Sequence, residues 1–178
     1  MKKKKWKLKK KKKVSMMMTE YGVALELDDF SGTVGGNISG TSDLAPLDEQ
    51  AAMLQEWFPD AQNVGLLYCS AEANSQYQVD VVKAELEALG YTCELYAFSD
   101  SNDLSAVCSS AAAACDVIYV PTDNTVAANT GIIDNICRPA KVPVIAGEAT
   151  LFQLAMSASF ITSTFLNGLP QKLIILAW

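Results

Sequence analysis

The sequence contains no histidine, which removes the commonest general base and the commonest zinc ligand of proteins. Its five cysteines form no C-x-x-C pair, and Cys108 and Cys115 stand two helical turns, about 10 Å, apart, too far for a disulfide. No apolar stretch reaches the length that spans a bilayer. These absences argue against metal and Cys-His chemistry. We therefore expect no catalytic residue, no metal and no cofactor, and we interpret the cysteines as small buried apolar residues.

Positive charge is concentrated at the N-terminal end, where residues 2–13 hold ten lysines. The remaining cations, set against 20 acids, are Lys83, Arg138, Lys141 and Lys172. Such an acidic body is unsuited to the nucleic acid backbone, so no nucleic-acid partner is expected. Residues 1–18 are predicted to form a solvated, disordered tail. Any contact with a membrane is expected to involve this tail only. They resemble the basic start of an export signal, but residues 14–18 are too short for its apolar region of at least about 7 residues, so no complete signal is expected.

The 178 residues, 50% of them apolar, suffice for one ordinary domain with a core. Residues 19–36 are predicted to be a remnant segment and a glycine-rich loop that fits neither a P-loop nor a dinucleotide fingerprint. A short extended piece, residues 38–43, leads into a helix that Pro59 ends. Strands and helices then alternate: strands at 64–68, 92–97, 117–120 and 144–146, and helices at 75–89, from Asn102 or Asp103 to 115, and at 125–137. Residues 151–178 are apolar without a clear period, and either form a buried final strand or end unnaturally.

Strands that alternate with helices make βαβ units, so the fold class is α/β with a doubly wound parallel sheet covered on both faces. In the common strand order, the second strand lies on one side of the first and the third strand on the other. The turns after the first and third strands then open a crevice at the switch point. These turns, residues 70–75 and 121–125, are the two most polar in the alternating region. The sequence predicts a ligand site there, although two ordinary capped turns would look similar.

Four segments carry a resemblance to a known family: Gly-Thr-Ser-Asp at 40–43, Glu-Ala-Asn-Ser at 72–75, Tyr-Val-Pro-Thr-Asp-Asn-Thr at 119–125 and Ala-Gly-Glu at 146–148. In order and spacing the chain resembles ABC transporter substrate-binding proteins similar to the tryptophan and tyrosine uptake lipoproteins, over about residues 35–148. The resemblance implies a type I periplasmic-binding-protein fold, with two α/β lobes that close on an amino acid, often aromatic. It also implies an ABC permease as partner and an extracytoplasmic, membrane-associated location.

By this resemblance, residues 37–148 are essentially the C-terminal lobe, most of the N-terminal lobe is missing, and residues 149–178 form a divergent apolar segment. The chain is thus expected to be a truncated, non-catalytic solute-binding component of an ABC importer. A receiver domain would need an acidic pair and a lysine where Cys69-Ser70 and Gly147-Glu148 stand. A hydrolase using Ser70 would need a base, and without histidine only a carboxylate or a lysine could serve. A ligand-sensing domain of a regulatory protein without a transport role is the alternative, because its ligand contacts would look alike.

An amino acid ligand needs an acceptor for its ammonium group and donors for its carboxylate. We expect Asp123, the only acid of its turn, to accept the ammonium group. Asn74 and Ser75, at a helix start, are expected to serve the carboxylate. The remaining candidate ligand-binding residues orient these groups, cap their helix or line the rim: Thr122, Asn124, Thr125, Glu72, Ser70 and Glu148. The alternative is that Ser75 and Thr125 are plain helix caps and that Glu148 is solvated, while Tyr119 is expected to pack in the core.

Overall fold

The structure is a computed structural model, and it describes residues 14–27, 30–32, 34 and 38–147. The chain divides into two compact units, Met1–Leu44 and Ala45–Trp178, and each is described by itself. The predictions for residues 1–13, for Glu148 and for residues 151–178 concern parts of the chain outside the described residues. The predicted boundary at residue 37 falls inside the first unit.

The first unit contains β1 (Val14–Met18), α1 (Tyr21–Ala24) and β2 (Ile38–Ser42). The two strands pair in parallel, with Val14 opposite Ile38 and Met18 opposite Ser42. The assignment of residues 14–18 to a disordered tail is therefore wrong, because β2 supplies the hydrogen-bond partner that the segment lacks on its own. Helix α1 begins where the Glu20 carboxylate accepts the N–H of Val23 at 2.6 Å, as an N-cap.

The second unit runs α2 (Leu47–Trp57), β3 (Asn63–Cys69), α3 (Ala73–Ala88), β4 (Thr92–Phe98), α4 (Ser101–Ala114), β5 (Val117–Val120), α5 (Asn124–Ala127), α6 (Thr130–Ala140) and β6 (Val144–Ala146). Within residues 45–147, the four strands pair in parallel in the order β4-β3-β5-β6, so that Leu66 lies opposite both Leu95 and Tyr119. The predicted doubly wound order is confirmed: β3 has the second strand on one side and the third on the other.

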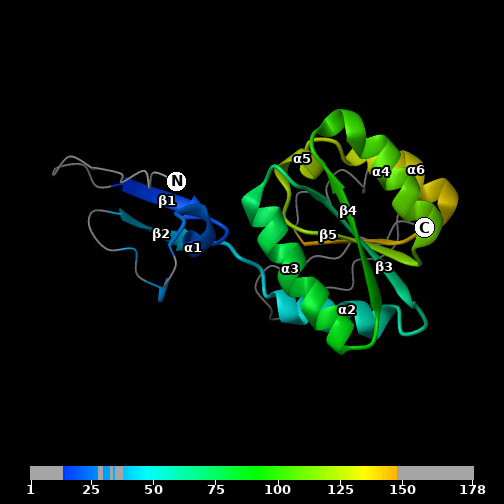
Figure 1. Cartoon of the computed structure of the whole chain (residues 1–178), viewed down its shortest axis with the longest axis horizontal. Helices are drawn as coiled ribbons and strands as arrows, with labels where there is room; N and C mark the ends of the chain where they lie inside the picture. The colour runs from blue at the N-terminus through cyan, green and yellow to red at the C-terminus, as the bar shows by residue number, and fades with distance from the viewer. Residues whose placement is uncertain (1–13, 28–29, 33, 35–37, 148–178) are drawn as a thin grey trace, which may run out of the picture. The chain divides into compact units, whose positions relative to one another are not determined.

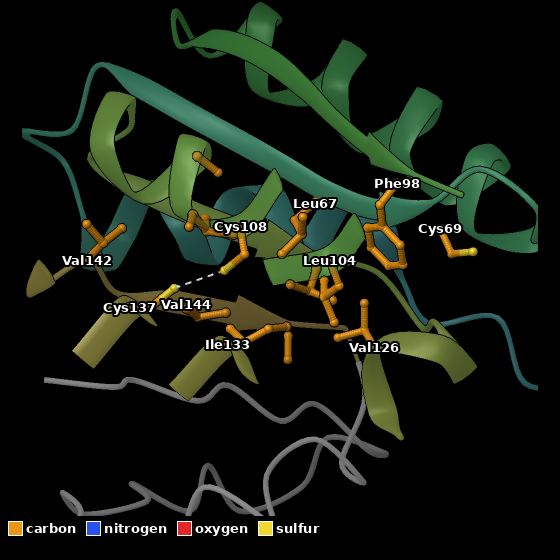
Figure 2. Close-up of a cluster of buried hydrophobic side chains, with 14 residues drawn as sticks. Leu67, Cys69, Phe98, Leu104, Cys108, Val126, Ile133, Cys137, Val142 and Val144 are labelled. Atoms are coloured by element: carbon orange, nitrogen blue, oxygen red, sulfur yellow. Dashed lines mark hydrogen bonds between the residues drawn. The ribbon is translucent and has the colours of Figure 1, made fainter. Parts of the chain in front are cut away.

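Two helical layers cover the sheet. Helix α2 packs against α3 on one face, and α4 packs against α6 on the other (Figure 1). Because side chains alternate along a strand, Leu67, Ile118 and Val144 face the α4–α6 layer, where they join a cluster of 14 buried residues (Figure 2). Tyr119 is almost fully buried, so its predicted role in packing is confirmed. Each fully buried apolar side chain contributes about 1.5–3 kcal/mol to folding.

The helix predicted over residues 125–137 is interrupted. Asn129, with φ −129° and ψ 24°, separates α5 from α6 and precedes the first residue of α6. Its side-chain amide donates to the Thr125 carbonyl oxygen at 2.8 Å, a local bond that competes with the regular helical pattern. Pro139 lies inside the last turn of α6, and Lys141 ends that helix with a left-handed φ of 58°. Helix α4 is capped by the carboxylate of Asp100 and not by Asn102 or Asp103.

Candidate ligand-binding edge of the sheet

The carboxyl ends of β3 and β5 lie side by side, and the polar turns that follow them are hydrogen-bonded to each other. The side-chain amide of Asn74 donates to the Thr122 carbonyl oxygen at 3.0 Å, and the Ser75 hydroxyl donates to the same oxygen at 3.4 Å. These residues are about 47 positions apart in the chain, and the parallel pairing of β3 with β5 brings them together. The structure thus places both predicted turns at one edge of the sheet.

The buried side chain of Asp123 connects the turn after β5 to the end of β3. This side chain is 0% exposed, and its two carboxylate oxygens accept the N–H of Cys69 at 2.7 Å and the N–H of Val126 at 2.9 Å. The first bond reaches the end of β3, and the second caps α5. The carboxylate therefore fixes the position of the β5 turn relative to β3. The predicted contact with a ligand ammonium group stays a prediction, and it requires access to an oxygen that is enclosed here.

Glu72 forms a second connection, closer to solvent. One of its oxygens accepts the backbone and side-chain N–H groups of Asn124, and the other accepts the N–H and the hydroxyl of Thr125, at 2.7–3.1 Å. Partial burial raises the pKa of Glu72, but these four hydrogen bonds lower it by more, so its pKa lies below the ordinary value of 4.5. Four donors saturate a carboxylate, so Glu72 holds the first turn of α5 in place.

Two buried glutamines complete the network, and the sequence interpretation missed both. The Gln78 side chain, 0% exposed, accepts the Thr122 N–H at 3.1 Å and donates to the Thr122 carbonyl oxygen at 3.2 Å, as a neighbouring strand would. Gln50 accepts the Tyr119 hydroxyl at 2.6 Å and donates to the Gly147 carbonyl oxygen at 3.4 Å. The helical spacing could have indicated that both glutamines are buried. Gln78 lies four residues before Val82 and Gln50 three residues after Leu47, so each occupies an inward position of its helix.

Some polar groups of this edge remain uncommitted. The Thr122 hydroxyl and the Asn124 side-chain carbonyl oxygen make no hydrogen bond with the described part of the chain, and the same holds for the N–H groups of Ala73 and Asn74 in the first turn of α3. Ser70 is exposed, and its hydroxyl donates to the Phe98 carbonyl oxygen. Ser75 is buried, in keeping with a structural role. The uncommitted groups can receive a polar ligand without breaking the network.

Over residues 14–147, within the ranges that the structure describes, no group of cysteine, aspartate and glutamate side chains is arranged to hold a metal ion. In the same ranges, no helix is long and apolar enough to span a membrane.

Comparison with known proteins identifies the family. Residues 10–169 match the family model for ABC transporter substrate binding proteins, so the chain belongs to that family, and the match is wider than the four segments that carry the resemblance. A tyrosine-binding protein of Clostridioides difficile (strain R20291) is 33% identical over 114 residues, which are 64% of this chain and 33% of the relative. Proteins related to this chain are binding proteins rather than enzymes.

Solved structures agree with the family. A Streptococcus pneumoniae ABC domain in complex with L-Trp matches with a TM-score of 0.71 and 27% identity, over 78% of this chain and 49% of the other. A ligand-free, open substrate-binding protein with adhesive properties from Clostridium difficile matches with a TM-score of 0.62 and 34% identity, over 76% and 46%. The chain therefore spans a third to a half of the length of these relatives. The predicted periplasmic-binding-protein-like fold is confirmed.

Proposed function

We propose that this chain is the ligand-binding part of a non-catalytic solute-binding component of an ABC importer, and that its ligand is an amino acid, in particular an aromatic one. Family membership supports the class of protein, and the tyrosine-binding relative and the L-Trp complex support the class of ligand. The observation that carries the proposal is the edge where β3 and β5 end, because its turns are fixed by Asp123, Glu72 and Gln78 while other polar groups stay uncommitted. An ABC permease would be the partner, and the location would be extracytoplasmic and membrane-associated.

In this proposal the eight predicted site residues that the structure describes divide into three groups. Asp123, Glu72 and Ser75 hold the turns, and any ligand contact of theirs follows from a rearrangement of the network. Thr122, Asn124 and Asn74 contact the ligand, because their free groups lie at the edge. The free N–H groups of the first turn of α3 receive the carboxylate, where the helix dipole favours negative charge. Ser70 and Thr125 line the rim.

Affinity is expected to be weak. Ligands of such proteins are buried between two lobes, and closure of the lobes removes most of the ligand surface from water. This chain spans 33–49% of its relatives' lengths, so it supplies part of that enclosure. Binding in the millimolar range is what the uncommitted groups of one edge would support.

The test is an NMR titration of the ¹⁵N-labelled chain with L-tryptophan, L-tyrosine and L-tryptophanamide. We expect saturable shifts of the amide signals of Ala73, Asn74 and Thr122 with the two amino acids, and much smaller shifts with tryptophanamide, which lacks the carboxylate. Thr122→Val keeps the side-chain shape and removes the free hydroxyl, so it should weaken binding without changing stability. Thr92→Val is the matched control, because Thr92 is exposed where β4 begins, at the opposite end of the sheet.

Two results would contradict the proposal. If none of the ligands produces saturable shifts, the chain alone does not bind these amino acids. Equal shifts with tryptophan and tryptophanamide would show that the start of α3 does not receive the carboxylate.

A further inference from the structure

Two cysteines face each other between the helices that cover one face of the sheet. Cys108 lies on α4 and Cys137 on α6, both are 0% exposed, and their sulfur atoms are 3.7 Å apart (Figure 2). The five cysteines of the chain all lie in the described residues, and all are free thiols in this structure. The other recorded thiol contacts are to oxygen, from Cys69 to the Ser99 carbonyl and from Cys115 to the Tyr96 hydroxyl.

The geometry is close to that of a disulfide. A sulfur–sulfur bond is about 2.05 Å long, so the two atoms, now 3.7 Å apart, must approach by roughly 1.6 Å. Rotation about both Cα–Cβ bonds supplies such a movement, since each sulfur shifts by less than 1 Å or so. Helices α4 and α6 already pack directly on each other, which keeps the two cysteines close together.

The two thiols are also electronically unequal. The hydrogen bond between the two sulfur atoms lowers the pKa of Cys108, while burial opposes the change. The same bond and burial raise the pKa of Cys137. A thiolate is the nucleophile in thiol–disulfide exchange, and both sulfurs are fully buried in the folded chain, so the first attack on an oxidant takes place before the helices enclose the pair.

We propose that Cys108 and Cys137 form a disulfide when the chain folds in the presence of an organic disulfide as oxidant. The thiolate of one cysteine of the pair attacks one sulfur of the oxidant, a mixed disulfide forms, and one thiolate leaves. The sulfur of the other cysteine, after loss of its proton, attacks the sulfur of the first cysteine and expels the second thiolate. Two protein thiols are oxidised, one oxidant disulfide is reduced to two thiols, and the bond is then enclosed by Leu104, Ala111 and Ile133.

The proposed disulfide would constrain the edge of the sheet where β3 and β5 end. Its formation does not depend on the proposed function. The segment that it closes contains β5, the turn with Thr122 and Asp123, and α5. Cross-linking removes conformational freedom from the unfolded chain, by an amount that grows with the length of the loop. An oxidising compartment, where solute-binding proteins of this family are typically located, is where such bonds form and persist.

The test uses the full chain, unfolded and refolded with either a reduced thiol or a mixture of reduced and oxidised glutathione. The products are denatured, alkylated and digested without reduction. We expect the oxidised sample to lose two alkylated thiols and to yield one linked peptide pair that carries Cys108 and Cys137. Its melting temperature should exceed that of the reduced sample by on the order of 10 °C.

Variants separate this pair from the other thiols. Cys137→Ala should alkylate at its four remaining cysteines and lose the redox-dependent shift in melting temperature. Cys93→Ala is the matched control, because it keeps the pair, and it should retain the full shift. The proposal is overturned if five cysteines alkylate after oxidative refolding, if the linked peptides carry another pair, or if Cys137→Ala retains the shift. The peptide map of the unmodified chain decides the matter even if a variant fails to fold.

Discussion

Replacement of Asp123 by alanine tests whether its carboxylate is primarily structural. The variant leaves the N–H groups of Cys69 and Val126 without an acceptor, and both residues are at most 2% exposed. A buried donor that loses its partner costs about 1–3 kcal/mol, and α5 also loses its cap. We therefore expect Asp123→Ala to lower the free energy of unfolding by about 3–5 kcal/mol, a large fraction of the roughly 5–15 kcal/mol of a typical domain.

The assay is urea unfolding of the full chain, followed by far-ultraviolet circular dichroism. The matched control is Asp100→Ala, because Asp100 also caps a helix but is exposed, and its single partner, the N–H of Asn102, is left to water. That variant should cost about 1 kcal/mol. Asp123→Asn should fall between the two, because the amide keeps one acceptor and presents a donor where the carboxylate had an acceptor.

The reasoning is refuted if Asp123→Ala is no more destabilising than Asp100→Ala, with an unchanged dependence of the free energy on urea concentration. A carboxylate reserved for a ligand would behave in that way, since its removal relieves the cost of burying a charge. The same experiment thus separates the structural role of Asp123 from the predicted contact with an ammonium group.

Three further substitutions probe the network. Glu72→Gln should destabilise the protein near neutral pH and have no effect in acid. The pKa of Glu72 is lowered in the folded state, so the stabilisation by this carboxylate is present above the unfolded pKa of 4.5 and disappears as the pH falls through the folded pKa. Urea unfolding of the original protein and the variant at several pH values checks this expectation. Gln78→Leu should cost about 1–3 kcal/mol in the same assay, because the Thr122 N–H loses its acceptor. Gly147→Ala should cost about 1–3 kcal/mol, seen as a lower melting temperature, because its Cβ would lie 3.1 Å from the Thr122 nitrogen.

The control for each of two of these substitutions makes the same replacement at another position of the chain. Gln76→Leu changes a half-buried glutamine of α3 whose side-chain amide donates to Asp80 at the surface, and it should stay within about 0.5 kcal/mol. Gly131→Ala, in α6, adds a Cβ with no atom within 4 Å and should be neutral or stabilising. Equal effects for Gln78→Leu and Gln76→Leu, or for the two glycine variants, would contradict the network, as would a Glu72→Gln effect that does not change with pH.

Much of the fold could be predicted because it depends on local patterns. The apolar run at 117–120 and the inward stripe of Val79, Val82 and Leu86 each indicate one element, and the alternation of elements then restricts the topology. Strand order alone brought the two polar turns together. The strand of residues 14–18 was missed, because it depends on a partner, β2, that begins 20 residues further along the chain.

The roles of individual polar side chains were harder to predict. Asp123 is predicted to bind a ligand because its turn is polar, and nothing in the local pattern indicates that its carboxylate also accepts a backbone N–H 54 residues away. Gln78 likewise serves a peptide group 44 residues away, and only the fold determines which one. The contact between Cys108 and Cys137 could not be predicted for the same reason. The spacing of cysteines along one helix does not indicate which residue of another helix lies beside them.

The hydrogen bonds of Gln50 also bear on the order in which the protein folds. This side chain joins Tyr119, 69 positions away, and Gly147, 97 positions away. Contacts between such distant residues carry a large loop-closure entropy and form slowly. During synthesis, moreover, Gly147 leaves the ribosome long after α2 and β3 are complete. We therefore expect the ligand edge to be among the last parts of this unit to reach its native arrangement, and amide protection there to lag behind that of β3 and β4 in pulse-labelled refolding.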